Sequence, residues 1–141
     1  MVIQYPPEHL RYLVSGEPNN SSESFLAMGK HCAQLILHAL IKSGADINNF
    51  KAILDFGCGC GRTIRHVRCL YRGRLHGTDY NPKLVRWCRR NLPFADFGIN
   101  HLDPPLPYEE EQFDLIYALS GFYSPSRATA DIMDSRALAD P

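Results

Sequence analysis

The stretch that most constrains this chain is residues 55–61, Asp-Phe-Gly-Cys-Gly-Cys-Gly, where three glycines alternate after an acid. The apolar residues 51–54 before it predict a buried strand that ends at the acid. Residues 62–71 after it carry apolar side chains at helical spacing, and Gly73 is placed to end that helix. A strand that enters a helix through alternate glycines exposes bare backbone and a helix N-terminus to a ligand, because a β-carbon would block the approach.

A second unit of the same kind follows. Residues 75–79 predict a strand that ends at Asp79, and one carboxylate can accept hydrogen bonds from both hydroxyls of a ribose. Asn81 and Pro82 then provide a cap and a first helical residue for a helix that runs to Leu92. Together these elements predict one β-α-β-α nucleotide-binding half. Two further strands are predicted at 97–100 and 113–119, separated by a proline-rich loop.

The acid followed by three alternating glycines resembles motif I of the class I methyltransferases that use S-adenosylmethionine, and ordered motifs extend the resemblance from residue 52 to about 120. It implies an α/β fold, a Rossmann-like three-layer sandwich with a mostly parallel sheet in the order 3-2-1-4, without the last strands of the seven-stranded family fold. It also implies S-adenosylmethionine as cofactor, a methyl acceptor that is a small molecule, and a cytoplasmic enzyme.

The resemblance implies a role for several positions. Asp55 lies near the amino-acid end of the cofactor, whose carboxylate faces the loop amides and the helix N-terminus. Asp79 takes the ribose diol, and Tyr80 lies along the adenine. Asn100 and His101 stand where the family recognises adenine, although this chain has Asn where an acid is common. The predicted cofactor-binding set is Asp55, Gly57, Cys58, Gly59, Gly61, Asp79, Tyr80, Asn100, His101 and Ala118. No catalytic base is identified.

The chain is expected to be one methyltransferase domain. Its parts are an N-terminal extension (1–22), a leading helix (23–44), a cofactor-binding core (51–120) and an atypical tail (121–141). The leading helix either packs as a layer on the sheet or covers the cofactor. The tail contains no convincing strand, and 126–139 fits one helix. Strand 113–119 would then be a sheet edge, which invites self-association and weak activity.

Other classes stay open. A dinucleotide-binding domain would need Gly or Ala where this chain has Arg62, and a non-catalytic remnant would keep only part of the cleft. Lys and Arg are concentrated between residues 51 and 90. They make either a nucleic-acid surface or solvated helix faces, and their place opposite the apolar stripes favours the second. The five cysteines fit a reducing compartment and show no metal-binding spacing. Neither a signal peptide nor a membrane span is expected, since the apolar runs are short.

Overall fold

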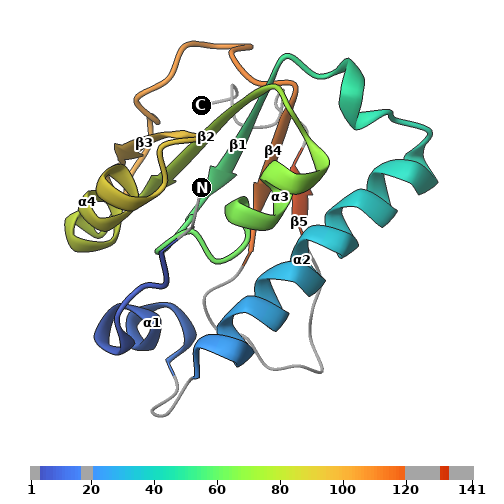
Figure 1. Cartoon of the computed structure of the whole chain (residues 1–141). Helices are drawn as coiled ribbons and strands as arrows, with labels where there is room; N and C mark the ends of the chain where they lie inside the picture. The colour runs from blue at the N-terminus through green and yellow to red at the C-terminus, as the bar shows by residue number, and fades with distance from the viewer. Residues whose placement is uncertain (1–3, 17–20, 120–130, 134–141) are drawn as a thin grey trace.

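The computed structural model describes residues 4–16, 21–119 and 131–133. The strands of this part form one sheet in the order β3-β2-β1-β4-β5 (Figure 1). β1 pairs in parallel with both β2 and β4, β2 pairs in parallel with β3, and β5 is antiparallel to β4. The bounds are β1 Ala52–Phe56, β2 Arg74–Asp79, β3 Asp96–Ile99, β4 Leu115–Ala118 and β5 Asp131–Met133. The predicted order 3-2-1-4 is therefore confirmed.

Helices α2 and α4 begin directly after residues whose side chains cap them. α2 follows Ser21, whose hydroxyl accepts from the Ser24 amide, and it ends before Gly44, which has a left-handed φ of 78°. α4 follows Asn81, whose side chain accepts from the Lys83 amide at 3.0 Å, as its sequence predicts. The bounds are α1 Glu8–Ser15, α2 Ser22–Ser43, α3 Ile64–Leu70 and α4 Pro82–Asn91, with a 3-10 turn at Ile47–Asn49.

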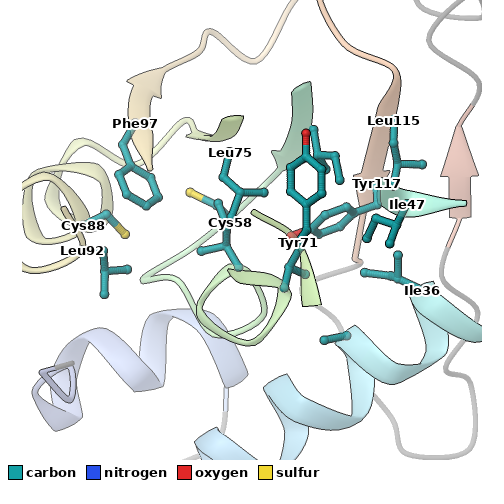
Figure 2. Packing of buried hydrophobic residues seen from close by; sticks show 14 of the residues in the cluster. Ile36, Ile47, Cys58, Tyr71, Leu75, Cys88, Leu92, Phe97, Leu115 and Tyr117 are labelled. Atoms are coloured by element: carbon teal, nitrogen blue, oxygen red, sulfur yellow. The ribbon is translucent and has the colours of Figure 1, made fainter. Parts of the chain in front are cut away.

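Side chains of alternate residues in the central strands point to opposite faces of the sheet. One face of β1 and β4 packs under α2 and α3 in the main core, where Ile53, Leu115 and Tyr117 meet Ile36 and Tyr71 (Figure 2). The opposite face carries a smaller cluster of Ala52, Leu54, Phe113 and Ile116, with Tyr108 packed against it. Within the described residues, α2, α3 and α4 thus cover one face of the sheet, and the connection between β3 and β4 packs against the other.

The tail differs from its prediction. Residues 131–133 form β5, and Tyr117 of β4 pairs with Ile132 of β5. The expected helix over 126–139 is wrong at these positions, and its remainder lies outside the described residues. β4 is therefore paired on both sides and is not a sheet edge. The reason offered for self-association, an exposed edge of β4, no longer holds.

α2 is 22 residues long and apolar enough to cross a membrane by length and composition alone. The expectation that every apolar run is too short for a span is corrected on that point. The buried residues of α2 are those of its core-facing side, Phe25, Gly29, Cys32, Ala33, Ile36 and Leu40. Ala33, Ile36 and Leu40 belong to the main core. Packing on the sheet accounts for the apolar residues on this side of the helix.

Arg65 corrects the expectation that the arginines of α3 lie on a solvated face. Its side chain is only 3% exposed. The guanidinium donates to the carbonyls of Gly61 (2.9 Å) and Gln4 (3.2 Å), and it lies 5.3 Å from the ring centre of Phe25. Arg65 therefore joins the N-terminal segment to the start of α3. Arg86, Arg89 and Arg90 on α4 are exposed, as the solvated-face interpretation expects.

Candidate functional site

A cleft of about 830 Å³ opens at the carboxyl ends of the parallel strands. In open parallel sheets ligands bind at this end, beside the point where the strand order reverses. Here the order reverses at β1, which has β2 on one side and β4 on the other. The cleft is lined by Leu13, Val14, Ser15, Gly16, Asp55, Phe56, Gly57, Cys58, Gly59, Arg62, Thr63, Asp79, Tyr80, Asn81, Leu84 and Leu119.

The three glycines of the loop after β1 all have positive φ, but their surroundings differ. A β-carbon on Gly57 would meet open space, so its absence does not make room for a neighbour inside the protein. A β-carbon on Gly59 would meet Val14 of α1, and one on Gly61 would meet Leu92 after α4. Gly59 and Gly61 therefore let α1 and the end of α4 approach the loop closely.

The loop amides are occupied by the protein itself. The amides of Gly57 and Cys58 donate to the Thr78 carbonyl at 2.8 and 2.9 Å, and the Gly61 amide donates to the Cys58 carbonyl. The sequence predicted that such amides face a bound carboxylate, and at these positions that is wrong. α3 begins only at Ile64 and has 7 residues. The amides of Gly57, Cys58 and Gly61 are therefore already used by the protein.

Asp79 fastens the glycine loop to β2. One carboxylate oxygen accepts from the Gly59 amide and the other from the Asn81 amide, both at 2.9 Å. The side chain lines the cleft but is only 7% exposed. Each carboxylate oxygen can accept more than one hydrogen bond, so both oxygens keep capacity for a ligand.

Asp55 is the second buried carboxylate of the cleft. Its Oδ2 accepts a hydrogen bond of 3.0 Å from the hydroxyl of Tyr117 on β4. The pKa of Asp55 is raised to about 7, chiefly by burial, while the hydrogen bond from Tyr117 lowers it, Asp79 nearby raises it and Arg62 lowers it. Burial likewise raises the pKa of Tyr117 well above its ordinary value. Around neutral pH, Asp55 therefore exchanges between its charged and neutral forms.

Sequence reasoning missed two contributors to the cleft. Arg62 lines it and is 7% exposed, which places a buried cation beside Asp55. α1 forms a wall through Leu13 and Val14, although residues 1–22 were predicted only as an extension. The signal for α1 was present, because Pro7 precedes Glu8 and Gly16 ends the helix in a left-handed conformation.

The structure brings together six of the predicted cofactor-binding residues, namely Asp55, Gly57, Cys58, Gly59, Asp79 and Tyr80. Gly61, Asn100, His101 and Ala118 are not in the lining. The Asn100 side chain accepts from the Thr78 hydroxyl at 2.9 Å and donates to the His101 carbonyl at 2.8 Å. Ala118 is the last residue of β4 and pairs with Phe56 of β1. The next residue, Leu119, lines the cleft. The roles assigned to these residues stay predictions.

The described part of the chain contains no group of three His, Cys, Asp or Glu side chains that could hold a metal ion. All five cysteines are free, and Cys58, Cys60 and Cys88 are buried around the glycine loop and α4. Burial raises the pKa of the Cys60 thiol to about 12, so this thiol is a poor nucleophile at neutral pH.

Comparison with known proteins gives the cleft its context. A family model described as a methyltransferase domain matches residues 53–135. A putative methyltransferase of Haloferax volcanii, solved with the Trm112 activator, is 20% identical with a TM-score of 0.53 and covers 82% of this chain and 48% of its own. Magnesium protoporphyrin IX methyltransferase from Synechocystis, solved with bound S-adenosylhomocysteine, is 16% identical with a TM-score of 0.52, covering 79% and 51%.

An amino pentose methyltransferase from Micromonospora echinaspora, solved with S-adenosylmethionine, is 18% identical with a TM-score of 0.50 and covers 79% of this chain and 41% of its own. No curated protein sequence matches. The chain thus spans about half the length of the solved structures described above. At these identities the structures show the shared fold, while the family model covers most of the chain, from β1 to β5. The chain belongs to the class I S-adenosylmethionine-dependent methyltransferase family.

Proposed function

We propose that the chain binds S-adenosylmethionine in the cleft and transfers its methyl group to a small-molecule acceptor. The observation that carries this proposal is the pair of buried carboxylates, Asp55 and Asp79, at the ends of neighbouring strands and on either side of the open Gly57. A ligand with a ribose diol at one end and an ammonium group at the other suits two carboxylates placed in this way.

Each part of the cofactor has a partner in the cleft. The ribose hydroxyls donate to Asp79, whose loop-holding hydrogen bonds already fix its orientation. The ammonium group pairs with Asp55. The carboxylate pairs with Arg62, which lines the cleft, because the amides of Gly57, Cys58 and Gly61 already donate to backbone carbonyls. Tyr80, 61% exposed at the rim, offers its ring to the adenine.

Methyl transfer requires mainly alignment of the reactants by the protein. The methyl group on the sulfonium is already electrophilic, so the chain has to align an acceptor nucleophile behind it and exclude competing water. The acceptor would enter beside Leu119 at the end of β4, next to Ala118. Two of the matched structures are named as methyltransferases of an amino pentose and of a magnesium porphyrin, which supports a small-molecule acceptor. We place the enzyme in the cytoplasm, where its thiols would stay reduced.

Titration calorimetry with S-adenosylmethionine, S-adenosylhomocysteine and NAD tests the proposal on the full chain. Binding of the first two without NAD is the expected result. Tight binding of NAD, or no binding of either adenosyl compound by the folded chain, would overturn it. A methyl-transfer assay over a panel of small amines, phenols and sugars then tests turnover. Cofactor binding without transfer to any acceptor would favour a non-catalytic remnant.

A further inference from the structure

Asp55 and Tyr117 form a buried, hydrogen-bonded pair of side chains. They are register partners on the parallel strands β1 and β4, and their side chains lie on the face covered by α2 and α3. The Tyr117 hydroxyl donates to Asp55 Oδ2 at 3.0 Å. Tyr117 itself is fully buried, packed near Tyr71 and Leu115 (Figure 2). A hydroxyl at such depth requires an acceptor, and a buried carboxylate requires a donor.

The charge of Asp55 depends on few groups. Burial is the largest influence and raises its pKa, and the hydrogen bond from Tyr117 is the next largest and lowers it. The remaining influences are Asp79 on β2, which raises the pKa, and Arg62 after the glycine loop, which lowers it. The thiols of Cys32 on α2 and Cys58 in the loop also feel this carboxylate, and their own pKa values are raised.

One oxygen of Asp55 is committed to Tyr117, which leaves Oδ1 for a ligand in the cleft that Asp55 lines. We propose that Tyr117 is a positioning residue for the cofactor, because its hydroxyl stabilises the charged form of Asp55 and directs Oδ1 to the ammonium group of the ligand. This inference rests on the proposed function, since it needs a ligand with an amino-acid end. Tyr117 touches no reacting atom and acts only through Asp55.

The matched control is Tyr71, which is equally buried in the same core (Figure 2). Its hydroxyl donates at 2.9 Å to the Phe50 carbonyl, at the opposite end of the sheet. Tyr117→Phe and Tyr71→Phe each remove one hydroxyl from the core and leave one acceptor without its donor. Only Tyr117→Phe removes a hydrogen bond from a residue of the cleft.

The test compares S-adenosylhomocysteine with methylthioadenosine, which keeps the adenosine and the thioether but lacks the amino-acid end. Calorimetry on the full chain from about pH 6 to about pH 8 gives both affinities, and circular dichroism checks the fold. In the wild type, the affinity for S-adenosylhomocysteine relative to methylthioadenosine should rise with pH, with a midpoint near the Asp55 pKa of about 7. Tyr117→Phe should move that midpoint upward by about one pH unit and weaken S-adenosylhomocysteine about tenfold at lower pH.

Methylthioadenosine should bind Tyr117→Phe as it binds the wild type, and Tyr71→Phe should leave both ligands unchanged. Equal losses for both ligands, or no shift of the midpoint, would overturn the inference. Absence of binding in the wild type would instead overturn the proposed function. If Tyr117→Phe does not fold, fluorotyrosine at position 117 provides the test, because a more acidic phenol is a stronger donor and should move the midpoint downward. An unmoved midpoint in that protein would also overturn the inference.

Discussion

Two hollows of similar size lie at opposite ends of the same sheet. The cleft at the carboxyl ends measures about 830 Å³, and a groove at the amino ends measures about 890 Å³. The first contains the buried carboxylates Asp55 and Asp79. The second is lined by cations from the strand starts and the end of α3, namely Lys51, Arg68, Arg72 and Arg74. Volume therefore does not identify the functional hollow.

The direction of the chain explains the contrast. Helices α3 and α4 run back from the cleft to the groove, so their C-terminal carbonyls gather at the amino ends of the strands. Arg68 satisfies such carbonyls, donating to Tyr71 (3.1 Å), Gly73 (3.2 Å) and Phe94 (2.7 Å). The two Nη atoms of Arg68 are thus engaged by backbone carbonyls of the protein, whereas its buried Nε has no hydrogen-bond partner among the described residues. At the carboxyl ends, by contrast, Asp55 and Asp79 keep acceptor capacity beside an open Gly57. The sign of the charge distinguishes the two ends better than volume does.

The largest effect is expected at Gly59. Gly59→Val should abolish binding of S-adenosylhomocysteine, because Gly59 has a φ of 57° and the new side chain would collide with Val14 of α1. Gly44→Val is the control, since Gly44 also has positive φ but open space around it at the end of α2. Calorimetry with circular dichroism on both variants measures the effect. A folded Gly59→Val protein with native affinity would remove the ligand from this cleft.

Asp79 and Asp114 compare the two ends directly, because each accepts two backbone amides. Asp79 holds Gly59 and Asn81, and Asp114 holds Lys51 and Ala52. Asp79→Ala and Asp114→Ala should each lower the free energy of unfolding by about 1–3 kcal/mol. Only Asp79→Ala should also weaken S-adenosylhomocysteine, by roughly 10–100-fold. Equal affinity in the two variants, measured by calorimetry, would show that Asp79 serves the loop alone.

The raised pKa of Asp55 should make the free energy of unfolding depend on pH. The folded pKa of about 7 lies above the ordinary value, so folding disfavours the charged form. The wild type should therefore lose stability relative to Asp55→Asn as pH rises from about 4 to about 7, by at most roughly 1.4 kcal/mol per pH unit, and the difference should level off above. Urea unfolding of both proteins measures it. A difference that does not vary with pH would contradict the raised pKa.

The smallest effect on cofactor affinity is expected at the amino ends. Arg68→Met should lower the free energy of unfolding by about 1–3 kcal/mol, because three carbonyls lose a donor, and should leave S-adenosylhomocysteine binding unchanged. Arg72→Met, at an exposed position, should change stability by less than about 0.5 kcal/mol. Urea unfolding and calorimetry measure both quantities. Loss of cofactor affinity in Arg68→Met would mean that the groove takes part in binding.

The sequence predicted the cofactor half of the fold well because its signals are local. Strand, glycine turn, capping residue and Pro82 each act within a few residues. The order β3-β2-β1-β4 was implied by the family resemblance that these residues carry, and the structure has it. β5 was not predicted because three residues, Asp131–Met133, are too few to show the alternation of a strand. Their pairing with β4 is a tertiary contact. The role of Tyr117 also required the structure, since only strand register places its hydroxyl beside Asp55.

The most direct test of the account is an amide chemical-shift map of the labelled chain during titration with S-adenosylhomocysteine. The amides of Gly57, Gly59 and Asn81, around the cleft, should shift on binding. Those of Gly73 and Ala95, in the amino-end groove, should not. Shifts concentrated in the groove, or none at ligand saturation, would contradict the assignment of the cofactor to the carboxyl ends of the strands.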